Sequence, residues 1–307
     1  MDFRMNKLLK KMMVALLSLG LVQAVWADNV PDFKETLQVA EQGNAKAQFS
    51  LGKMYYEGQG VRQDYAEAAR WYLKAAEQGY PAAQNNLGAM YAKGQGVHQD
   101  YAQAMMWYRK AAEQGAAAAQ YNLGLLYAND SSLHQDYVQA EKWYRKAAEQ
   151  GYPAAQNNLG AMYAKGQGVR QDYAQAMEWY RKSAKQGYAP AQNNLGVMYD
   201  EGKGVRQDYA QAAGWFLKAA EQGVATAQFN LGVMYETGRG VRQDSAQAAQ
   251  WFRKAAEQGD AYAQHNLALM HVNGQGVPQN YKIAKEWLGK ACANGSQRSC
   301  YAYHILD

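Results

Sequence analysis

The chain has 307 residues, of which 48% are hydrophobic and 19% charged, and its formal net charge is +5. Without residues 1–27 the charge is +2, from 28 basic and 26 acidic residues. This near balance excludes the strongly basic composition expected of a nucleic-acid-binding protein.

Residues 1–27 have the pattern of a secretory signal peptide. Lysines precede an uncharged, largely apolar run at residues 12–22, and the small residue Ala27 stands at the expected cleavage point. The run is shorter than the about 20 apolar residues that span a bilayer, and no later stretch is long and apolar enough. We therefore predict a mature chain that begins near Asp28, is exported to a bacterial periplasm or secreted, and has no integral membrane span.

A period of 36 residues dominates the rest of the chain. Tryptophan recurs with this spacing at Trp71, Trp107, Trp143, Trp179, Trp215, Trp251 and Trp287. A fixed period of this length predicts a solenoid, in which each repeat buries its apolar face only against its neighbours. We assign seven repeats to residues 44–295, a capping helix to residues 28–43 and a C-terminal cap to residues 296–307.

Each repeat is predicted to contain two helices, as the second repeat illustrates. Pro81 opens its first helix, because proline is tolerated in the first helical turn, and Gly94 ends that helix. Asp100 opens the second helix as an N-cap, and Gln103 is expected to reach back to the Asp100 amide in a capping box. Gly115 stops the second helix in a position suited to a left-handed cap. The fold class is therefore all-α.

Glycine also recurs in the middle of the first helix, from Gly52 to Gly232, although it costs about 1 kcal/mol there relative to alanine. This column predicts a close approach of the backbone of the neighbouring helix, with large aromatic side chains in the adjacent holes. The Gly-x-Gly loops are not a phosphate cradle, because they follow helices and their dinucleotide fingerprint is incomplete.

The repeat reads A-x-x-L-G-x-M-Y-x-x-G-x-G-V-x-x-D-Y-x-x-A-x-x-W-Y-x-K-A-A-x-x-G over about residues 44–295. This pattern resembles the Sel-1-like repeat, a relative of the tetratricopeptide repeat. The resemblance implies antiparallel helix pairs that wind into a right-handed α/α superhelical solenoid. It also implies a protein that serves as an adaptor for other proteins.

The two cysteines, Cys292 and Cys300, lie where one helix ends and the next, antiparallel helix begins. Export favours a disulfide between them, which would pin the end of the array and contribute about 2 kcal/mol. A structural zinc ion needs four ligands, and only His304 lies near the pair, so we predict no metal site and no cofactor. The pair is similar to those of secreted cysteine-rich family members, although those proteins carry such a pair in most repeats.

One side of the first helices is predicted to bind a partner. With about 100° between successive residues, the positions that scarcely change between repeats form one arc, and the freely changing positions form the other. By analogy with tetratricopeptide folds, the second arc lines a concave groove for a protein or peptide. We call this arc the variable face, and its candidate residues are Phe49, Lys53, Tyr56, Asn85, Tyr121, Asn157, Asn193, Asp200, Phe229, Glu236 and His265.

Aromatic and amide side chains on the variable face suit an extended peptide, because they offer contact area and hydrogen bonds without strong charge. Asp200, Glu201 and Glu236 favour a basic segment in the C-terminal half. Variability by itself leaves open that these positions are solvent-facing and drift neutrally. It also leaves open a purely structural spacer.

The enzymatic alternative starts from Ser50. Ser50 and Lys53 have the Ser-x-x-Lys spacing of penicillin-recognising enzymes, which makes a weak β-lactamase or penicillin-binding hydrolase the second hypothesis. The companion Ser-Asp-Asn and Lys-Thr-Gly motifs are missing from the sequence, and asparagine replaces Ser50 in all later repeats. We therefore predict no catalytic residues and favour an exported scaffold that acts in the bacterial envelope or on a host.

Overall fold

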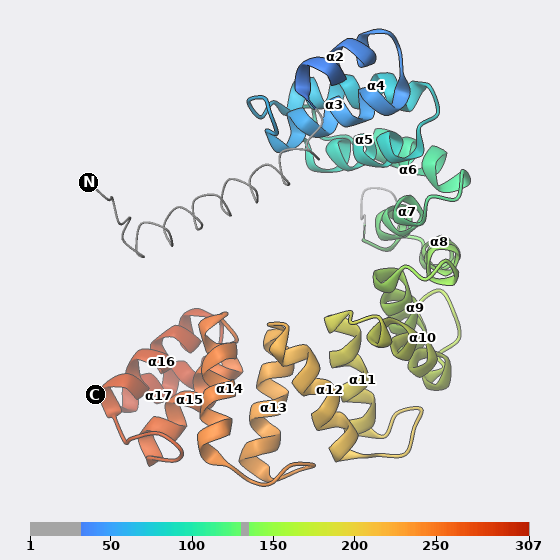
Figure 1. The fold of residues 1–307 in the computed structure, drawn as a ribbon. Helices are drawn as coiled ribbons and strands as arrows, with labels where there is room; N and C mark the ends of the chain where they lie inside the picture. Colours follow the sequence, from blue (N-terminus) through green and yellow to red (C-terminus); the bar gives the residue numbers. More distant parts are fainter. Residues whose placement is uncertain (1–31, 130–134, 307) are drawn as a thin grey trace, which may run out of the picture. The chain divides into compact units, whose positions relative to one another are not determined.

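The computed structural model describes residues 32–129 and 135–306, so the predicted signal peptide at residues 1–27 lies outside the described residues. Within those ranges every regular element is a helix. None of the helices in the described part is long and apolar enough to cross a membrane. The chain divides into two compact units, residues 1–119 and 120–307, which we call the N-terminal and C-terminal units (Figure 1).

The N-terminal unit contains the helices α2 (Phe33–Glu41), α3 (Ala45–Glu57), α4 (Tyr65–Glu77), α5 (Pro81–Lys93) and α6 (Tyr101–Glu113). Helix α7 (Ala117–Asn129) begins at the end of this unit and lies mostly in the next. The C-terminal unit continues with α8 (Tyr137–Glu149), α9 (Pro153–Lys165), α10 (Tyr173–Lys185), α11 (Ala189–Glu201), α12 (Tyr209–Glu221), α13 (Ala225–Thr237), α14 (Ser245–Glu257), α15 (Ala261–Asn273), α16 (Tyr281–Ala293) and α17 (Gln297–Ile305).

Odd-numbered helices from α3 to α15 are the first helices of the repeats, and even-numbered helices from α4 to α16 are the second helices. Within each unit, successive helices pack against one another in tandem. Helix α17 follows the seventh repeat and packs against α16. The prediction of an all-α solenoid built from seven helical hairpins is therefore confirmed.

The ends of the helices follow the predicted capping residues. The Asp100 carboxylate accepts a hydrogen bond from the Gln103 amide, while Gly94 and Gly115 have φ angles of 66° and 90° in the left-handed region. The second hydrogen bond predicted for the capping box, from the Asp100 backbone amide to the Gln103 side chain, is wrong. The Asp100 amide donates to the Tyr91 carbonyl, at 3.0 Å, because the loop folds back on the last turn of the first helix and offers that carbonyl instead of the Gln103 side chain.

The mid-helix glycines lie under an aromatic ring. A Cβ atom on Gly52 would lie 2.6 Å from Cδ1 of Tyr72 on the second helix of the same repeat. The close approach is therefore made by a ring, whereas we predicted helix backbone. In the seventh repeat the position is Ala268, and the partner residue is the smaller Leu288. In this repeat the added methyl group is therefore matched by a smaller neighbouring side chain.

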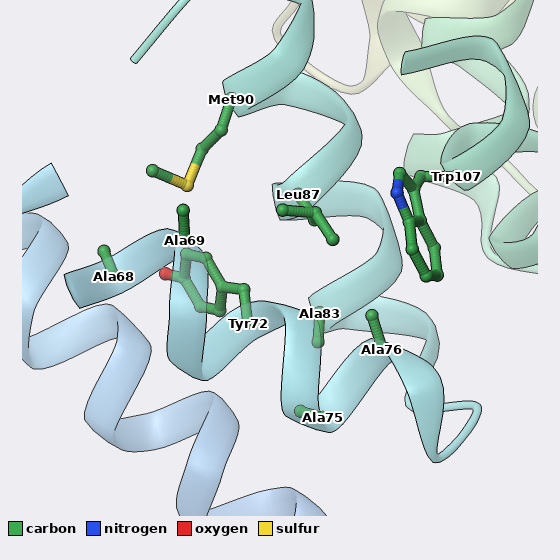
Figure 2. Close-up of a cluster of buried hydrophobic side chains, with 9 residues drawn as sticks. All are labelled: Ala68, Ala69, Tyr72, Ala75, Ala76, Ala83, Leu87, Met90 and Trp107. Carbon is green, nitrogen blue, oxygen red and sulfur yellow. The ribbon is translucent and has the colours of Figure 1, made fainter. Parts of the chain in front are cut away.

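The core of each unit runs continuously through successive helices. In Figure 2, the buried side chains of Tyr72, Leu87 and Trp107 come from α4, α5 and α6 and belong to one cluster. Small residues such as Ala75 and Ala83, both with 0% exposure, let the helices come close enough to bury the larger side chains. No single hairpin could bury this cluster by itself, which is the property expected of a repeat array.

A buried glutamine in each first helix joins neighbouring hairpins. The Gln84 Nε2 atom donates to the Ala76 carbonyl at 3.0 Å, and the Gln84 Oε1 atom accepts from the side-chain Nε2 atom of Gln114 at 2.8 Å. The same two hydrogen bonds recur at Gln48, Gln156, Gln192, Gln228 and Gln264. These buried amides are therefore satisfied by partners from both sides, as buried polar groups require.

Candidate functional site

Three aromatic residues of the variable face hold the same position in the first, third and sixth repeats. The Phe49 ring lies 5.7 Å from the ring of Tyr72 and 5.2 Å from that of Tyr80, measured between ring centroids. Tyr121 makes the equivalent contacts with Tyr144 and Tyr152. Phe229 packs against Phe252, the equivalent of Tyr72, and against Tyr262, which holds a different repeat position from Tyr80. Each of the three rings is half-buried, so it contributes to packing and still leaves part of its surface exposed to solvent.

In the N-terminal unit the variable face is hollowed. Phe49, Lys53 and Tyr56 line a hollow of about 300 Å³, and its other lining residues are Glu57, Tyr72, Asn86, Ala89 and Met90. Most of the lining is carbon from aromatic rings and the Met90 side chain. The structure thus brings together three of the predicted residues in one concave site.

Polar contacts fix the walls of this hollow. The Tyr56 hydroxyl donates to Gln95 Oε1 at 3.1 Å, and burial raises the pKa of Tyr72 to about 12, although its hydrogen bond with Asn86 lowers that pKa. The Lys53 amine lies 3.8 Å from a Glu57 carboxylate oxygen, and both side chains are exposed. Such an exposed pair contributes little to stability, so the amine can turn toward a bound group.

Two predicted residues lie largely beneath the surface. Asn157 is 9% exposed, and its Oδ1 atom accepts from Asn194 Nδ2 at 2.9 Å. His265 is 8% exposed, and burial, followed by the nearby Arg298, lowers its pKa. Both side chains connect successive first helices and leave little surface for a partner.

The remaining amides of the variable face are half-buried. Asn85 Nδ2 donates to Asn86 Oδ1 at 3.4 Å. Asn193 Oδ1 is buried and has no hydrogen-bond partner among the residues that the structure describes. The amide positions therefore differ in how much hydrogen-bonding capacity they keep.

Asp200 and Glu236 hold the position of Tyr56 in the fifth and sixth repeats. Both are half-buried, and burial raises the pKa of Glu236. Within residues 32–129 and 135–306 no hydrogen bond or ion pair reaches the Glu236 carboxylate. Glu201, by contrast, pairs with Lys203 at 2.7 Å. The C-terminal unit therefore presents acidic groups that its own cations do not neutralise.

The geometry assembles no catalytic group around Ser50. In the described part of the chain, no hydrogen bond joins Ser50 to Lys53 or to a histidine. The same residues contain no group of three or more His, Cys, Asp or Glu side chains placed to hold a metal ion. The second, enzymatic hypothesis thus gains no nucleophile activated by a base.

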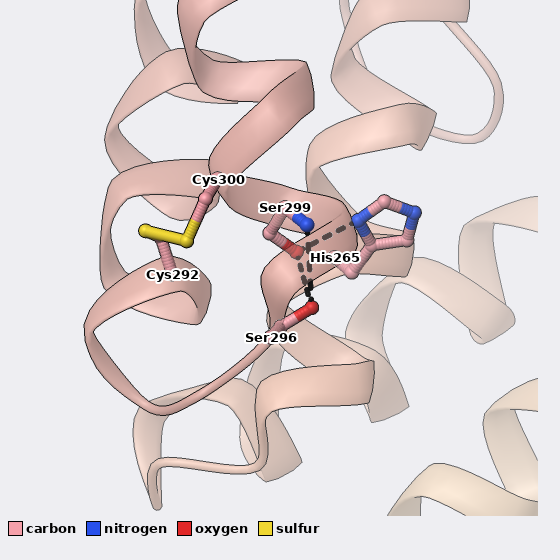
Figure 3. Close-up of a disulfide and its surroundings, with 5 residues drawn as sticks. All are labelled: His265, Cys292, Ser296, Ser299 and Cys300. Atoms are coloured by element: carbon pink, nitrogen blue, oxygen red, sulfur yellow. Dashed lines mark hydrogen bonds between the residues drawn. A yellow bond between two sulfur atoms is a disulfide. The ribbon is translucent and has the colours of Figure 1, made fainter.

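Cys292 and Cys300 form a disulfide between α16 and α17, with Cα atoms 4.7 Å apart (Figure 3). Next to it, Ser299 is fully buried, and its Oγ atom lies 2.9 Å from His265 Nδ1 and 2.8 Å from Ser296 Oγ. These contacts hold α17 against α15 and α16 of the seventh repeat.

Sequence reasoning missed Tyr72, Asn86 and Met90 as lining residues of the hollow. Asn86 and Met90 belong to positions of the first helix that scarcely change between repeats, which we assigned to packing, and Tyr72 lies on the second helix, outside the variable face. The signal available in the sequence was Ala89, which holds the Lys53 position in the second repeat. A short side chain there leaves space beside the larger residues of the first repeat.

A family model described as Sel1 repeat matches the chain at residues 45–80, 81–115, 117–152, 153–188, 189–224, 225–260 and 261–296. No curated protein matches the chain. The periodic residues that define the hairpins are therefore the ones that relate this chain to other proteins.

Solved structures give the same relationship. The protective antigen c5321 of uropathogenic Escherichia coli, described as displaying an SLR fold, is 40% identical with a TM-score of 0.81, over 89% of this chain and 59% of that one. This chain thus spans less than two thirds of that protein. A Sel1 repeat protein from Oxalobacter formigenes is 39% identical with a TM-score of 0.75, over 90% of this chain and 80% of that one. Yeast Tom70, at 14% identity and a TM-score of 0.50 over 89% of this chain and 55% of that one, shares the fold alone.

Proposed function

The chain belongs to the Sel1 repeat family, and from this premise we propose that it is an exported scaffold without enzymatic activity, which binds a protein or peptide through its variable face. Solenoids of helical repeats commonly bind partners along a surface shared by successive repeats. The observation that carries the proposal is the hollow of about 300 Å³ beside Phe49. A concave, largely apolar site with a few polar groups is the usual form of a binding site.

The hollow suits one bulky apolar side chain of a partner. The rings of Phe49 and Tyr72 and the thioether of Met90 would surround that side chain, as anchor residues are surrounded in protein interfaces. The Asn86 amide and the Lys53 amine lie at the same site and offer donors to the adjoining peptide carbonyls. Binding would therefore combine apolar contact area with hydrogen bonds to the partner backbone.

The proposal places the protein in the bacterial envelope or its surroundings. Support comes from the signal pattern of residues 1–27 and from the Cys292–Cys300 disulfide, because disulfides persist in oxidising compartments. The similarity to c5321, a protective antigen, supports contact with a host. Fractionation of cells, with N-terminal sequencing of the exported chain, should find a start near Asp28. A full-length chain in the cytoplasm would contradict export.

Capture of partners from an envelope fraction tests the binding site. Chemical crosslinking followed by purification should recover a partner with the native chain and lose it with Phe49→Ala combined with Tyr56→Ala. Val138→Ala is the matched control, because Val138 is 62% exposed on the second helix α8. Melting curves establish that each variant is folded. Equal recovery of the partner by the double variant would refute the assignment of the hollow.

A further inference from the structure

We propose that the variable face of the C-terminal unit binds a basic segment of the partner, through the Glu236 carboxylate and the adjacent aromatic pair Phe229 and Tyr262. This inference depends on the proposed function and specifies the chemistry of the partner at one part of the chain. Its residues lie on α13 and α15, which belong to the same unit.

Glu236 is placed where a carboxylate destabilises the fold. It is the second-last residue of α13, at the helix end where the macrodipole is negative and disfavours an acidic side chain. Its side chain is also half-buried, and the carboxylate has no cation or hydrogen-bond donor among the described residues, so its charge loses hydration without compensation. A cation supplied from outside the chain would remove both penalties.

The repeat itself does not need an acid at this position. The equivalent residues in four other repeats are apolar, namely Ala92, Ala128, Ala164 and Val272. The preceding repeat has Asp200, also half-buried and also in the last turn of its helix, α11. Two consecutive repeats therefore carry unfavourably placed carboxylates that packing does not explain.

An exposed aromatic residue lies beside the same helix. Tyr262 is 74% exposed, and its ring lies 6.1 Å from the ring of Phe229, between centroids. The equivalent residues in the other repeats are Lys46, Ala82, Ala118, Ala154, Pro190 and Thr226, so this position too has no structural need for a ring. Exposed aromatic faces bind apolar side chains and also attract Lys and Arg cations.

The spacing of these groups defines the segment that fits. Phe229 and Glu236 are seven residues apart on α13, which is about 10 Å along a helix axis. An extended peptide covers that distance in about three residues. The preferred segment therefore has a basic residue about three positions from an aromatic or large aliphatic residue. In the first repeat the corresponding positions are Phe49 and Tyr56 with Lys53 between them, so the N-terminal unit would disfavour the same segment.

Panning a phage library of random dodecapeptides against the full chain tests the inference. We expect enrichment of peptides in which Lys or Arg stands three positions from an aromatic or large aliphatic residue. In fluorescence anisotropy, a selected peptide should lose affinity about tenfold with Glu236→Gln, because a hydrogen bond to a charged group is lost. Tyr262→Ala should also weaken binding. Glu221→Gln should leave the affinity unchanged, because Glu221 is an exposed carboxylate on the second helix α12 and not on the variable face.

The outcomes separate this inference from the proposed function. Peptides that are acidic or neutral, or whose affinity is unaffected by Glu236→Gln, would overturn the basic segment. If those peptides still lose affinity with Phe49→Ala, the proposed function stands. A library that yields no binding peptide would refute the proposed function itself. A melting temperature of the Glu236→Gln chain that is equal to or above the native value excludes a folding defect as the cause of lost binding.

Discussion

The packing of a ring on each mid-helix glycine predicts how Gly232 and Phe252 depend on each other. A Cβ atom on Gly232 would lie 2.7 Å from both Cδ1 and Cε1 of Phe252, which is closer than carbon atoms pack. Overpacking of this kind costs about 1–3 kcal/mol, while replacing a mid-helix glycine by alanine gains about 1 kcal/mol. Gly232→Ala should therefore lower the free energy of unfolding by about 1 kcal/mol.

The seventh repeat supplies the compensating change, because it combines Ala268 with Leu288. Phe252→Leu alone should cost about 1–2 kcal/mol through the space it leaves. Added to Gly232→Ala, it should cost less than the sum, with a coupling of about 1 kcal/mol in the double-mutant cycle. Urea unfolding gives the four free energies, provided that the slope with denaturant is unchanged. Strictly additive effects, or a Gly232→Ala variant more stable than the native chain, would refute the contact.

Three further predictions concern the buried amides, the cap and the buried tyrosines. Gln84→Ala should lower the free energy of unfolding in urea by about 1–3 kcal/mol, because the Ala76 carbonyl and the Gln114 side-chain amide lose their partner. The control Gln250→Ala should change that free energy little, because Gln250 is exposed. Cys300→Ser should lower the free energy of unfolding by about 2 kcal/mol and speed amide hydrogen exchange in α17 more than elsewhere. Unchanged exchange in α17 would contradict the role of the disulfide. Burial raises the pKa of Tyr72, Tyr108 and Tyr180 to about 12, so the fold favours their protonated form. The stability they contribute is complete below pH 10, the ordinary pKa, and is lost as the pH rises through about 12. Tyrosinate absorbance during an alkaline titration should show this delayed ionisation, and Tyr72→Phe should reduce it.

The helices were predictable because residues at or next to each helix end determine where that helix begins and ends. Pro81, Asp100 and Gly115 set helix boundaries through their own backbone and capping chemistry, and a 36-residue period repeats that chemistry in every hairpin. The contacts between hairpins were not predictable in the same way. A constant position shows that Gln84 matters, but only the three-dimensional arrangement shows that it bonds to Ala76 and Gln114.

The sequence predicted which face of the first helices holds the candidate site. It did not predict how deeply each side chain on that face is buried. Phe49 and Asn157 hold the same position in different repeats, yet Phe49 lines a hollow while Asn157 lies beneath the surface. The neighbouring repeats also differ, because the second repeat places Ala89 at the hollow beside Phe49, whereas the fifth repeat, which follows that of Asn157, has Val197 at the equivalent position. A periodic pattern treats those neighbours as equivalent. The superhelical hand, the signal peptide and the partner stay predictions.

Site-specific photo-crosslinking in living cells tests the central claim most directly. A photoreactive phenylalanine analogue would replace Lys53 on the variable face or, in a second strain, Met106, which is 39% exposed on the second helix α6 of the same unit. Binding through the variable face predicts a covalent adduct with a partner from position 53 and none from position 106. Adducts from position 106 alone would contradict it.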